Sequence, residues 1–337
     1  LEDRAQPTPG YGEVLLRVRV CGVCTSDVHL LRTLTAPPPS TYTIQEVPVG
    51  PQPGLHAWHV ASTTNAGHLA PDRLPLFLGH EVSGVVEALG EGVSGVEAGQ
   101  PVTALAQRGF AEYTTARAAN IIPLPKNIPL HLALGEPIAC AANAAMRAGI
   151  QLGDTVVLVG AGFMGALLLQ FVTQLGAAHV SVIDPRPSAR ALARQLGADS
   201  VLDPGENDPV RAILSLTEGA GADVVIEATG NQRGLDLAAT LTRTRGRLVI
   251  YGYHQGGTRT VDAQLWNLRG LDIVNAHQRD NSDYMKGMRV GINMLKHRKL
   301  DMTSLVTHRF PLEQIADAFA LALERPEGFV KAIVEPT

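Results

Sequence analysis

A glycine-rich turn between an apolar strand and a helical segment constrains this chain more than any other feature. Residues 155–160 form a continuous apolar stretch that leads directly into Gly160-Ala161-Gly162-Phe163-Met164-Gly165. The first glycine allows a tight turn, the second lets backbone approach a pyrophosphate, and the third permits close packing of helix on strand. Free N–H groups at the start of the helix hold the anion. The pattern predicts a dinucleotide site contacted by Gly160, Gly162, Phe163, Met164 and Gly165.

The segment after residue 150 alternates between apolar strands and helices. Strands are predicted at 155–160, 179–184, 223–227, 248–251 and 271–276, and helices at 163–175, 188–196 and 235–241. This alternation is typical of an α/β fold with a doubly wound parallel sheet, the Rossmann arrangement.

Three further residues are predicted to contact the cofactor. Asp184 ends the second strand, where a carboxylate accepts hydrogen bonds from ribose hydroxyls, so NAD is preferred over NADP. Arg186 weakens that preference, since an arginine pairs with a 2′-phosphate, and a solvated acid at a strand end is the other interpretation of Asp184. Thr229, after the strand at 223–227, is also counted as cofactor-binding.

The first part of the chain is rich in predicted strands instead. They lie at 13–20, 81–88, 100–105 and 111–115, and a Pro-, Gly-, Ser- and Thr-rich stretch at 32–75 is predicted to be a long loop or insertion. Helices are predicted at 284–296 and 312–323, and a closing strand at 330–334 is expected to rejoin the first domain. A chain of 337 residues suggests two domains: 1–128 completed by 278–337, and 129–277.

Three polar residues before the glycine turn suggest a metal. Cys24, His80 and Glu136 offer one sulfur, one nitrogen and one oxygen, and catalytic zinc usually keeps three protein ligands and one open position. The stretch from Cys21 to His29 (Cys-Gly-Val-Cys-Thr-Ser-Asp-Val-His) resembles the zinc-binding stretch of the medium-chain dehydrogenase/reductase family, and Gly79-His80-Glu81 resembles its second ligand motif. Glu136-Pro137 is similar to the third ligand in the polyol (sorbitol-like) and threonine dehydrogenase branches.

The resemblance implies a GroES-like, β-rich catalytic domain, a Rossmann cofactor domain and an active site in the cleft between them. It implies that Cys24 binds the metal and Cys21 does not, and that Ser26 and His29 pass the substrate's proton to solvent. Asp27 is expected to orient His80, and Glu81 to lie behind the metal. Turn or capping roles remain open for Ser26 and Asp27, a plain histidine for His29, and a partner to a basic group for Glu81.

Two departures from the family stand out. With only three cysteines, Cys21, Cys24 and Cys140, the four-cysteine site of a structural zinc is ruled out, leaving one catalytic zinc. Cys140 is interpreted as a packing residue. The stretch from Cys24 to His80 is also longer than usual, and its segment 32–75 holds His56, Trp58, His59 and His68. A lid, a subunit contact and a surface excursion are all open interpretations, and a second metal is a weaker one.

The substrate prediction depends on residues after the last parallel strand. His277, Gln278 and Arg279 offer polar groups that suit a polyol, cyclitol or sugar, although a polar hinge explains them nearly as well. The predicted function is an NAD- and zinc-dependent alcohol or polyol dehydrogenase. A zinc-free quinone or enoyl reductase of the same fold, and a non-catalytic NAD-binding protein, remain alternatives.

Composition excludes other classes of partner. The net charge of −4 gives no reason to expect nucleic acid or a membrane surface, and no apolar run approaches a membrane span. The odd cysteine count, without a signal peptide, favours a cytoplasmic protein. Because the chain opens at Leu1, a leading segment is expected to be missing. A homodimer or homotetramer is expected by resemblance alone.

Overall fold

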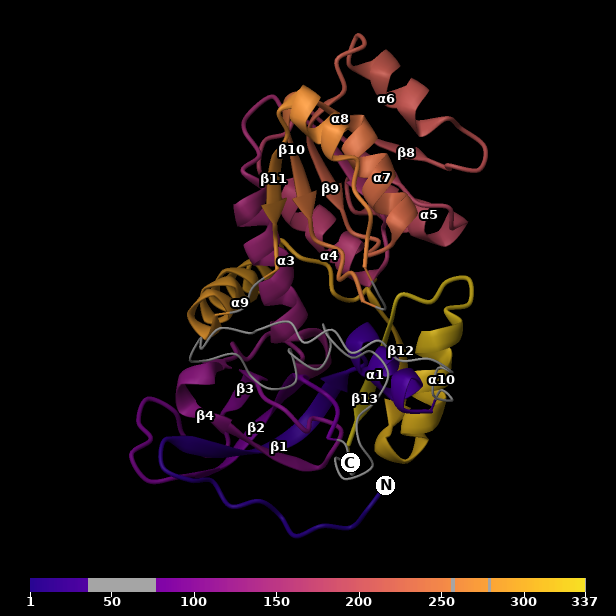
Figure 1. The fold of residues 1–337 in the computed structure, drawn as a ribbon. Coiled ribbons are helices and arrows are strands. Elements are labelled where there is room, and N and C mark those ends of the chain that lie inside the picture. The colour runs from indigo at the N-terminus through magenta and orange to yellow at the C-terminus, as the bar shows by residue number, and fades with distance from the viewer. Residues whose placement is uncertain (36–76, 256–257, 278–279, 337) are drawn as a thin grey trace, which may run out of the picture.

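The computed structural model describes residues 1–35, 77–255, 258–277 and 280–336 (Figure 1). Within these residues two sheets form, one seven-stranded and one six-stranded. In Figure 1 the seven-stranded sheet lies at the bottom and the six-stranded sheet at the top. The two sheets correspond to the β-rich and the alternating parts of the sequence.

The seven-stranded sheet joins both ends of the chain. Its strands are β1 (Glu13–Gly22), β2 (Glu81–Leu89), β3 (Pro101–Leu105), β4 (Tyr113–Arg117), β5 (Ile121–Pro123), β12 (Val306–Pro311) and β13 (Lys331–Glu335). The order is β12-β13-β1-β2-β3-β5, with β4 also on β1. The closing strand β13 runs antiparallel to β1, with Val334 opposite Cys21. The C-terminal segment therefore belongs to the first sheet, while the predicted domain boundaries stay a prediction.

The six-stranded sheet is parallel, in the order β11-β10-β9-β6-β7-β8. Its strands are β6 (Thr155–Val159), β7 (His179–Ile183), β8 (Ser200–Leu202), β9 (Ala222–Glu227), β10 (Thr242–Ile250) and β11 (Asp272–Asn275). Its connecting helices are α4 (Phe163–Val172), α5 (Pro187–Gln195), α6 (Pro209–Leu216), α7 (Gln232–Leu241) and α8 (Ala263–Arg269). The predicted fold class, a doubly wound parallel sheet with a β-rich second unit, is confirmed.

In the described parts of the chain, four helices lie outside that alternation, and two of them run between the sheets. They are α1 (Thr25–Thr35), α3 (Gly135–Ala148), α9 (Asn281–Lys296) and α10 (Ile315–Glu324). Short 3-10 turns occur at Ala118–Asn120, Leu130–Leu132 and Leu312–Gln314. In Figure 1, α3 runs from the upper sheet to the lower one, with α9 beside it. Helix α3 therefore links the two sheets.

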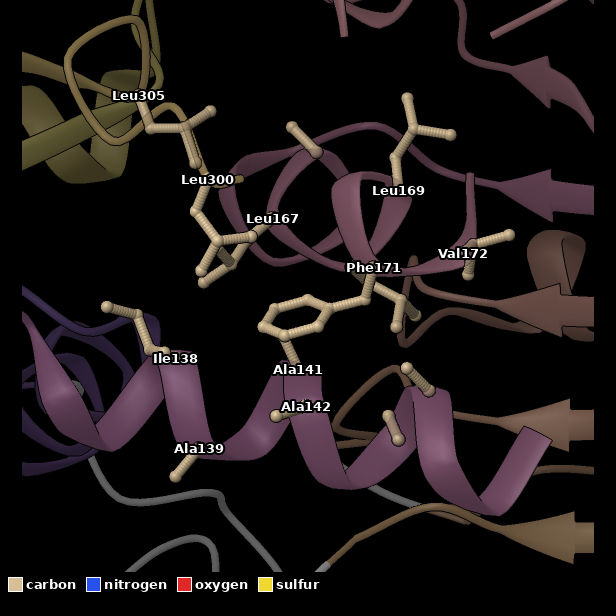
Figure 2. Close-up of a cluster of buried hydrophobic side chains, with 14 of the residues drawn as sticks. Ile138, Ala139, Ala141, Ala142, Leu167, Leu169, Phe171, Val172, Leu300 and Leu305 are labelled. Atoms are coloured by element: carbon tan, nitrogen blue, oxygen red, sulfur yellow. The ribbon is translucent and has the colours of Figure 1, made fainter. Parts of the chain in front are cut away.

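The main apolar core forms around α3 and α4. Small side chains such as Ala141 and Ala142 let α3 approach its neighbours closely, and Phe171 of α4 points its ring toward α3 at Ala141 (Figure 2). Leu300 and Leu305 from the C-terminal part of the chain join the same cluster. This core holds Glu136 and Cys140, on the first turns of α3, in a fixed position.

Some elements differ from the sequence-based expectation. Residues 32–35, predicted to begin a loop, form the end of α1, and residues 36–75 lie outside the described residues. Packing accounts for the formation of α1, because its Val28 is buried in one apolar cluster with Phe319 of α10. Helix α6 did carry a local signal: Asp208 caps it and Pro209 occupies its first turn. Among the described residues, no helix combines the length and apolar character needed to cross a membrane.

Candidate active site

A cavity of about 280 Å³ lies where the two sheets meet. Its polar lining from the seven-stranded sheet and its neighbours includes Cys24, Ser26, His80, Glu81, Glu136, Cys140, Arg325 and Lys331. From the six-stranded sheet and its connections, the cavity lining includes Gly162, Phe163, Met164, Gly165, Arg186, Thr229, Tyr251, Tyr253 and His277. The predicted metal ligands and the phosphate-binding turn therefore share one cavity.

The metal-ligand candidates meet because β1 and β2 are paired. Cys24 follows the end of β1 and His80 precedes β2, and Gly22 stands opposite Glu81 in the register. The ligand atoms of Cys24, His80 and Glu81 lie within 4.8 Å of one another. A sulfur, a ring nitrogen and a carboxylate oxygen at this separation fit a zinc ion.

The two cysteines at the end of β1 have different environments. Cys21 is fully buried, and burial, with the nearby charges of Asp27 and Glu81, raises the pKa of its thiol well above the usual value. Cys24 lines the cavity, and the Ser26 hydroxyl donates to its sulfur at 3.2 Å. A metal needs a thiolate, so the geometry favours Cys24 over Cys21.

His80 is held by Asp27. The ring Nδ1 lies 3.5 Å from Asp27 Oδ1, which also accepts from the backbone N–H of Gly79 at 3.2 Å. Burial acts to lower the pKa of His80, but the charges of Asp27 and Cys24 outweigh it and raise that pKa well above the usual value. With Nδ1 facing Asp27, Nε2 is the nitrogen left for a metal.

For the predicted third metal ligand, Glu136, the structure adds a hydrogen bond that was not predicted. Glu136 lines the cavity but lies outside the tight cluster, and its Oε1 accepts the Cys140 thiol at 3.3 Å. Burial raises the pKa of Glu136. Ligation by Glu136 stays a prediction, and Cys140, interpreted from sequence as packing, also hydrogen-bonds that candidate ligand.

Glu81 belongs to a buried ion pair. Its Oε1 accepts from Lys331 Nζ at 2.6 Å, while its buried Oε2 has no hydrogen-bond partner among the described residues. Lys331 also donates to the Val23 carbonyl at 3.0 Å and lies 4.3 Å from the ring centre of Phe163. Sequence reasoning missed Lys331, because nothing near it in the chain points to Glu81.

The proposed proton path is only partly described. Ser26 lines the cavity beside Cys24, and His29 follows three residues later on α1, so the two share one face of the helix. His29 is not among the described residues that line the cavity. The relay therefore stays a prediction.

The glycine turn has the shape that a dinucleotide requires. Gly160 has φ +98°, and a Cβ at Gly165 would lie 2.1 Å from the Gly160 carbonyl oxygen, so both positions need glycine for the fold itself. At Gly162 a Cβ would meet only Arg186, at 3.7 Å. Space is thus left open above Gly162, at the start of α4, which fits an approaching pyrophosphate.

Asp184 is buried at the end of β7, and both its oxygens are in use. Oδ2 accepts from the Ala161 N–H at 2.8 Å and from Arg186 Nη2 at 3.0 Å. Oδ1 accepts from the backbone N–H of Arg186 at 2.9 Å and from its Nε at 3.0 Å. A ribose hydroxyl therefore shares or displaces one of these bonds, and the predicted ribose contact stays a prediction.

Of the predicted substrate residues, the structure describes His277. His277 lines the cavity, and its Nε2 is 3.3 Å from the Gly252 carbonyl oxygen, while Gln278 and Arg279 lie outside the described residues. Thr229 lines the cavity, and its backbone N–H donates to Glu227 at 2.6 Å.

Three tyrosines, Tyr251, Tyr253 and Tyr284, also line the cavity. Tyr251 and Tyr253 were missed from sequence. They directly follow β10, and the carboxyl ends of parallel strands are where ligands bind in this fold, so a signal was present.

Comparisons with known proteins agree with this geometry. Residues 10–126 match the family model described as the alcohol dehydrogenase GroES-like domain, and residues 164–290 match the zinc-binding dehydrogenase model. Human sorbitol dehydrogenase is 29% identical over 95% of this chain and 88% of its own length. L-threonine 3-dehydrogenase of Pyrococcus furiosus is 27% identical over 94% and 89%. The solved structure of galactitol-1-phosphate dehydrogenase from Escherichia coli has a TM-score of 0.79 at 21% identity, covering 100% and 96%.

Fold and site together define a zinc-binding dehydrogenase. One model spans β1 to β5 and the other spans β7 to β11, and the zinc-ligand candidates and the glycine turn line one cavity. The chain belongs to the zinc-dependent alcohol dehydrogenase family.

Proposed function

We propose that this chain transfers hydride reversibly between NAD and a secondary alcohol, and that the alcohol is a polyol, cyclitol or sugar. The observation that carries the proposal is the single cavity lined by Cys24, His80 and Glu136 and by the turn residues Gly162 and Met164. Hydride transfer at a metal-activated alcohol needs both sets of residues in one place. A protein that only bound NAD would not need the ligand set.

The chain's own residues supply positioning and proton handling. Bound zinc acts as a Lewis acid that lowers the pKa of an alcohol hydroxyl, and nicotinamide accepts the hydride. Asp27 fixes the ring orientation of His80 through Nδ1. Ser26, whose hydroxyl lies 3.2 Å from the Cys24 sulfur, would accept the substrate's hydroxyl proton as it releases its own toward His29, and His29 would release a proton to solvent.

A polyhydroxylated substrate is supported by the aromatic and polar side chains that line the cavity. Tyr251, Tyr253, Tyr284 and His277 combine apolar faces with hydrogen-bonding tips. Such a lining suits a compound with several hydroxyls better than a plain aliphatic alcohol. The names of the relatives, sorbitol and L-threonine dehydrogenases, agree with a polar secondary alcohol. The proposal also predicts that alanine at Gln278 and Arg279 raises KM for a polyol with little change in NAD affinity.

A panel assay tests the function. Zinc content is first measured on the purified full chain, and NADH formation from NAD is then followed with sugars, cyclitols, linear polyols, threonine and simple alcohols. Turnover confined to the polyhydroxylated compounds supports the proposal. Turnover of simple alcohols alone contradicts the substrate class, and protein that takes up no zinc would favour the zinc-free reductase.

Assembly and location also stay predictions. A homodimer or homotetramer is expected, and sedimentation velocity on the purified chain measures it. A cytoplasmic location is expected as well.

A further inference from the structure

A loop from the C-terminal part of the chain reaches the cofactor side of the cavity. Residues 325–328 follow α10, and Glu327 Oε1 accepts from the backbone N–H of Ser188 at 2.7 Å. The N–H of Gly328 also lies 3.3 Å from the Ser188 hydroxyl. Ser188 is in the first turn of α5, where free N–H groups favour a negative charge. The Glu327 carboxylate therefore lies at the N-terminus of α5, where a negative charge is favoured, near the residues expected to contact the ribose.

Two arginines of the cavity lining lie in or near this loop. Arg186 comes directly before α5 and is paired with Asp184, and Arg325 comes from the same loop as Glu327. Both line the cavity. Burial and the neighbouring Arg186 charge lower the pKa of Arg325, while Asp184 and, more weakly, Glu327 raise the pKa of Arg186. The two guanidinium groups therefore lie close together, with Asp184 and Glu327 as nearby negative charges.

We propose that Glu327 is a specificity-determining residue that makes the cofactor site select NAD over NADP. The proposal rests on the proposed function, since it assumes that Asp184 faces the ribose. A 2′-phosphate would lie next to Asp184 and would need the positive groups near it: the Arg186 guanidinium and the N–H groups of α5. Glu327 already holds one of those N–H groups and places a like charge beside the phosphate. Asp184 alone is a weak barrier, because Arg186 pairs with both its oxygens.

The test measures binding without any alcohol. Dissociation constants of NADH and NADPH are measured by nicotinamide fluorescence for the full wild-type chain and for Glu327→Gln. Removing the like charge is expected to tighten NADPH binding by at least about tenfold, with NADH changed by less than about threefold. Glu324→Gln removes the charge of an exposed acid three residues earlier in the chain. It is the matched control and is expected to change neither dissociation constant.

A double variant identifies the origin of the gain. Arg186→Ala in the Glu327→Gln background is expected to abolish the new NADPH affinity, because the phosphate then loses its guanidinium partner. Unchanged NADPH affinity in Glu327→Gln, with tight NADH binding, overturns this inference and leaves the proposed function intact. Wild-type protein that binds NADPH as tightly as NADH also overturns it. Wild-type protein that binds neither dinucleotide overturns both.

Discussion

At the residue scale, Cys21 at the end of β1 and Cys24 just after it allow a direct comparison of two cysteines. They are three positions apart, yet Cys21 is fully buried and Cys24 lines the cavity. We expect Cys24→Ala to lower zinc affinity by at least about 100-fold, since even the loss of an outer partner costs ten- to a hundredfold. Cys21→Ala should retain zinc. Zinc content after dialysis, measured by mass spectrometry, checks both.

The same assay decides the third ligand. Glu136→Gln is expected to lose zinc, as predicted from its place before Pro137. Retention of zinc in Glu136→Gln together with its loss in Glu81→Gln would assign the ligand to Glu81, which the structure places nearer to Cys24 and His80.

Asp223 carries a prediction about pH. Its Oδ2 accepts from the Thr155 N–H at 2.8 Å and its Oδ1 from Arg243 Nε at 2.7 Å. Burial acts to raise the pKa of Asp223, but the Thr155 N–H and Arg243 outweigh burial and hold it below its usual value. Because the folded pKa is the lower one, the carboxylate stabilises the fold above about pH 3.9, and the effect is lost as pH falls through the folded pKa.

Asp223→Asn is therefore expected to lower the free energy of unfolding by about 1–2 kcal/mol at neutral pH. The difference from wild type should shrink as the pH falls below about 4. Urea unfolding over a pH series measures it. Glu206→Gln, at an exposed position, is the control and should give no such trend. A difference that is constant with pH would contradict the ionic origin.

At the element scale, Gly162 before α4 and Gly165 in its first turn separate binding from folding. A Cβ at Gly165 collides with the Gly160 carbonyl oxygen, whereas a Cβ at Gly162 reaches nothing closer than Arg186 at 3.7 Å. Gly165→Ala should therefore lower the free energy of unfolding by several kcal/mol. Gly162→Ala should leave stability within about 1 kcal/mol of wild type and weaken NADH binding by more than about tenfold. Thermal unfolding and NADH titration of both variants make the comparison, and equal NADH affinity in Gly162→Ala would show that no phosphate approaches this backbone.

Helices and strands were predicted from the sequence where a short-range pattern of residues marks them. The strand-turn-helix was predicted at 155–175 because β6 is almost uniformly apolar and is followed by three spaced glycines, and its helix ends at Val172 in the structure. Residues 32–35 of α1 were assigned to a loop because the stretch 32–75 is rich in Pro, Gly, Ser and Thr and has little periodicity. The burial of Val28 in one cluster with Phe319 of α10 is a tertiary feature that this composition does not indicate. Helix α3 holds Glu136 and Cys140 on adjacent turns, so helical spacing alone would have placed Cys140 beside the predicted ligand.

At the scale of the whole molecule, a buried ion pair joins strand β2 to the C-terminal strand β13. Glu81 of β2 and Lys331 of β13 are 250 residues apart, and their side chains are 1% and 5% exposed. Glu81→Gln leaves a buried charge without its partner, so we expect it to lower the free energy of unfolding by about 3–5 kcal/mol. Lys331→Met added to Glu81→Gln should restore part of that loss. Denaturant unfolding of the metal-free single and double variants measures it, and equal stability of both variants would show that the charges do not interact.

Local sequence patterns predicted the alternating fold and the glycine turn before α4, and they selected several residues that line the cavity. These depend on short-range patterns, namely apolar runs, glycine spacing and motifs of a few residues. Two contacts appear only once the chain is folded: Lys331 holds Glu81, and Glu327 reaches Ser188 from 139 residues away. The physical reason is that a charged side chain acts on whichever group lies within a few ångströms. For segments far apart in the chain, that group is set by strand pairing and by the way the two sheets meet.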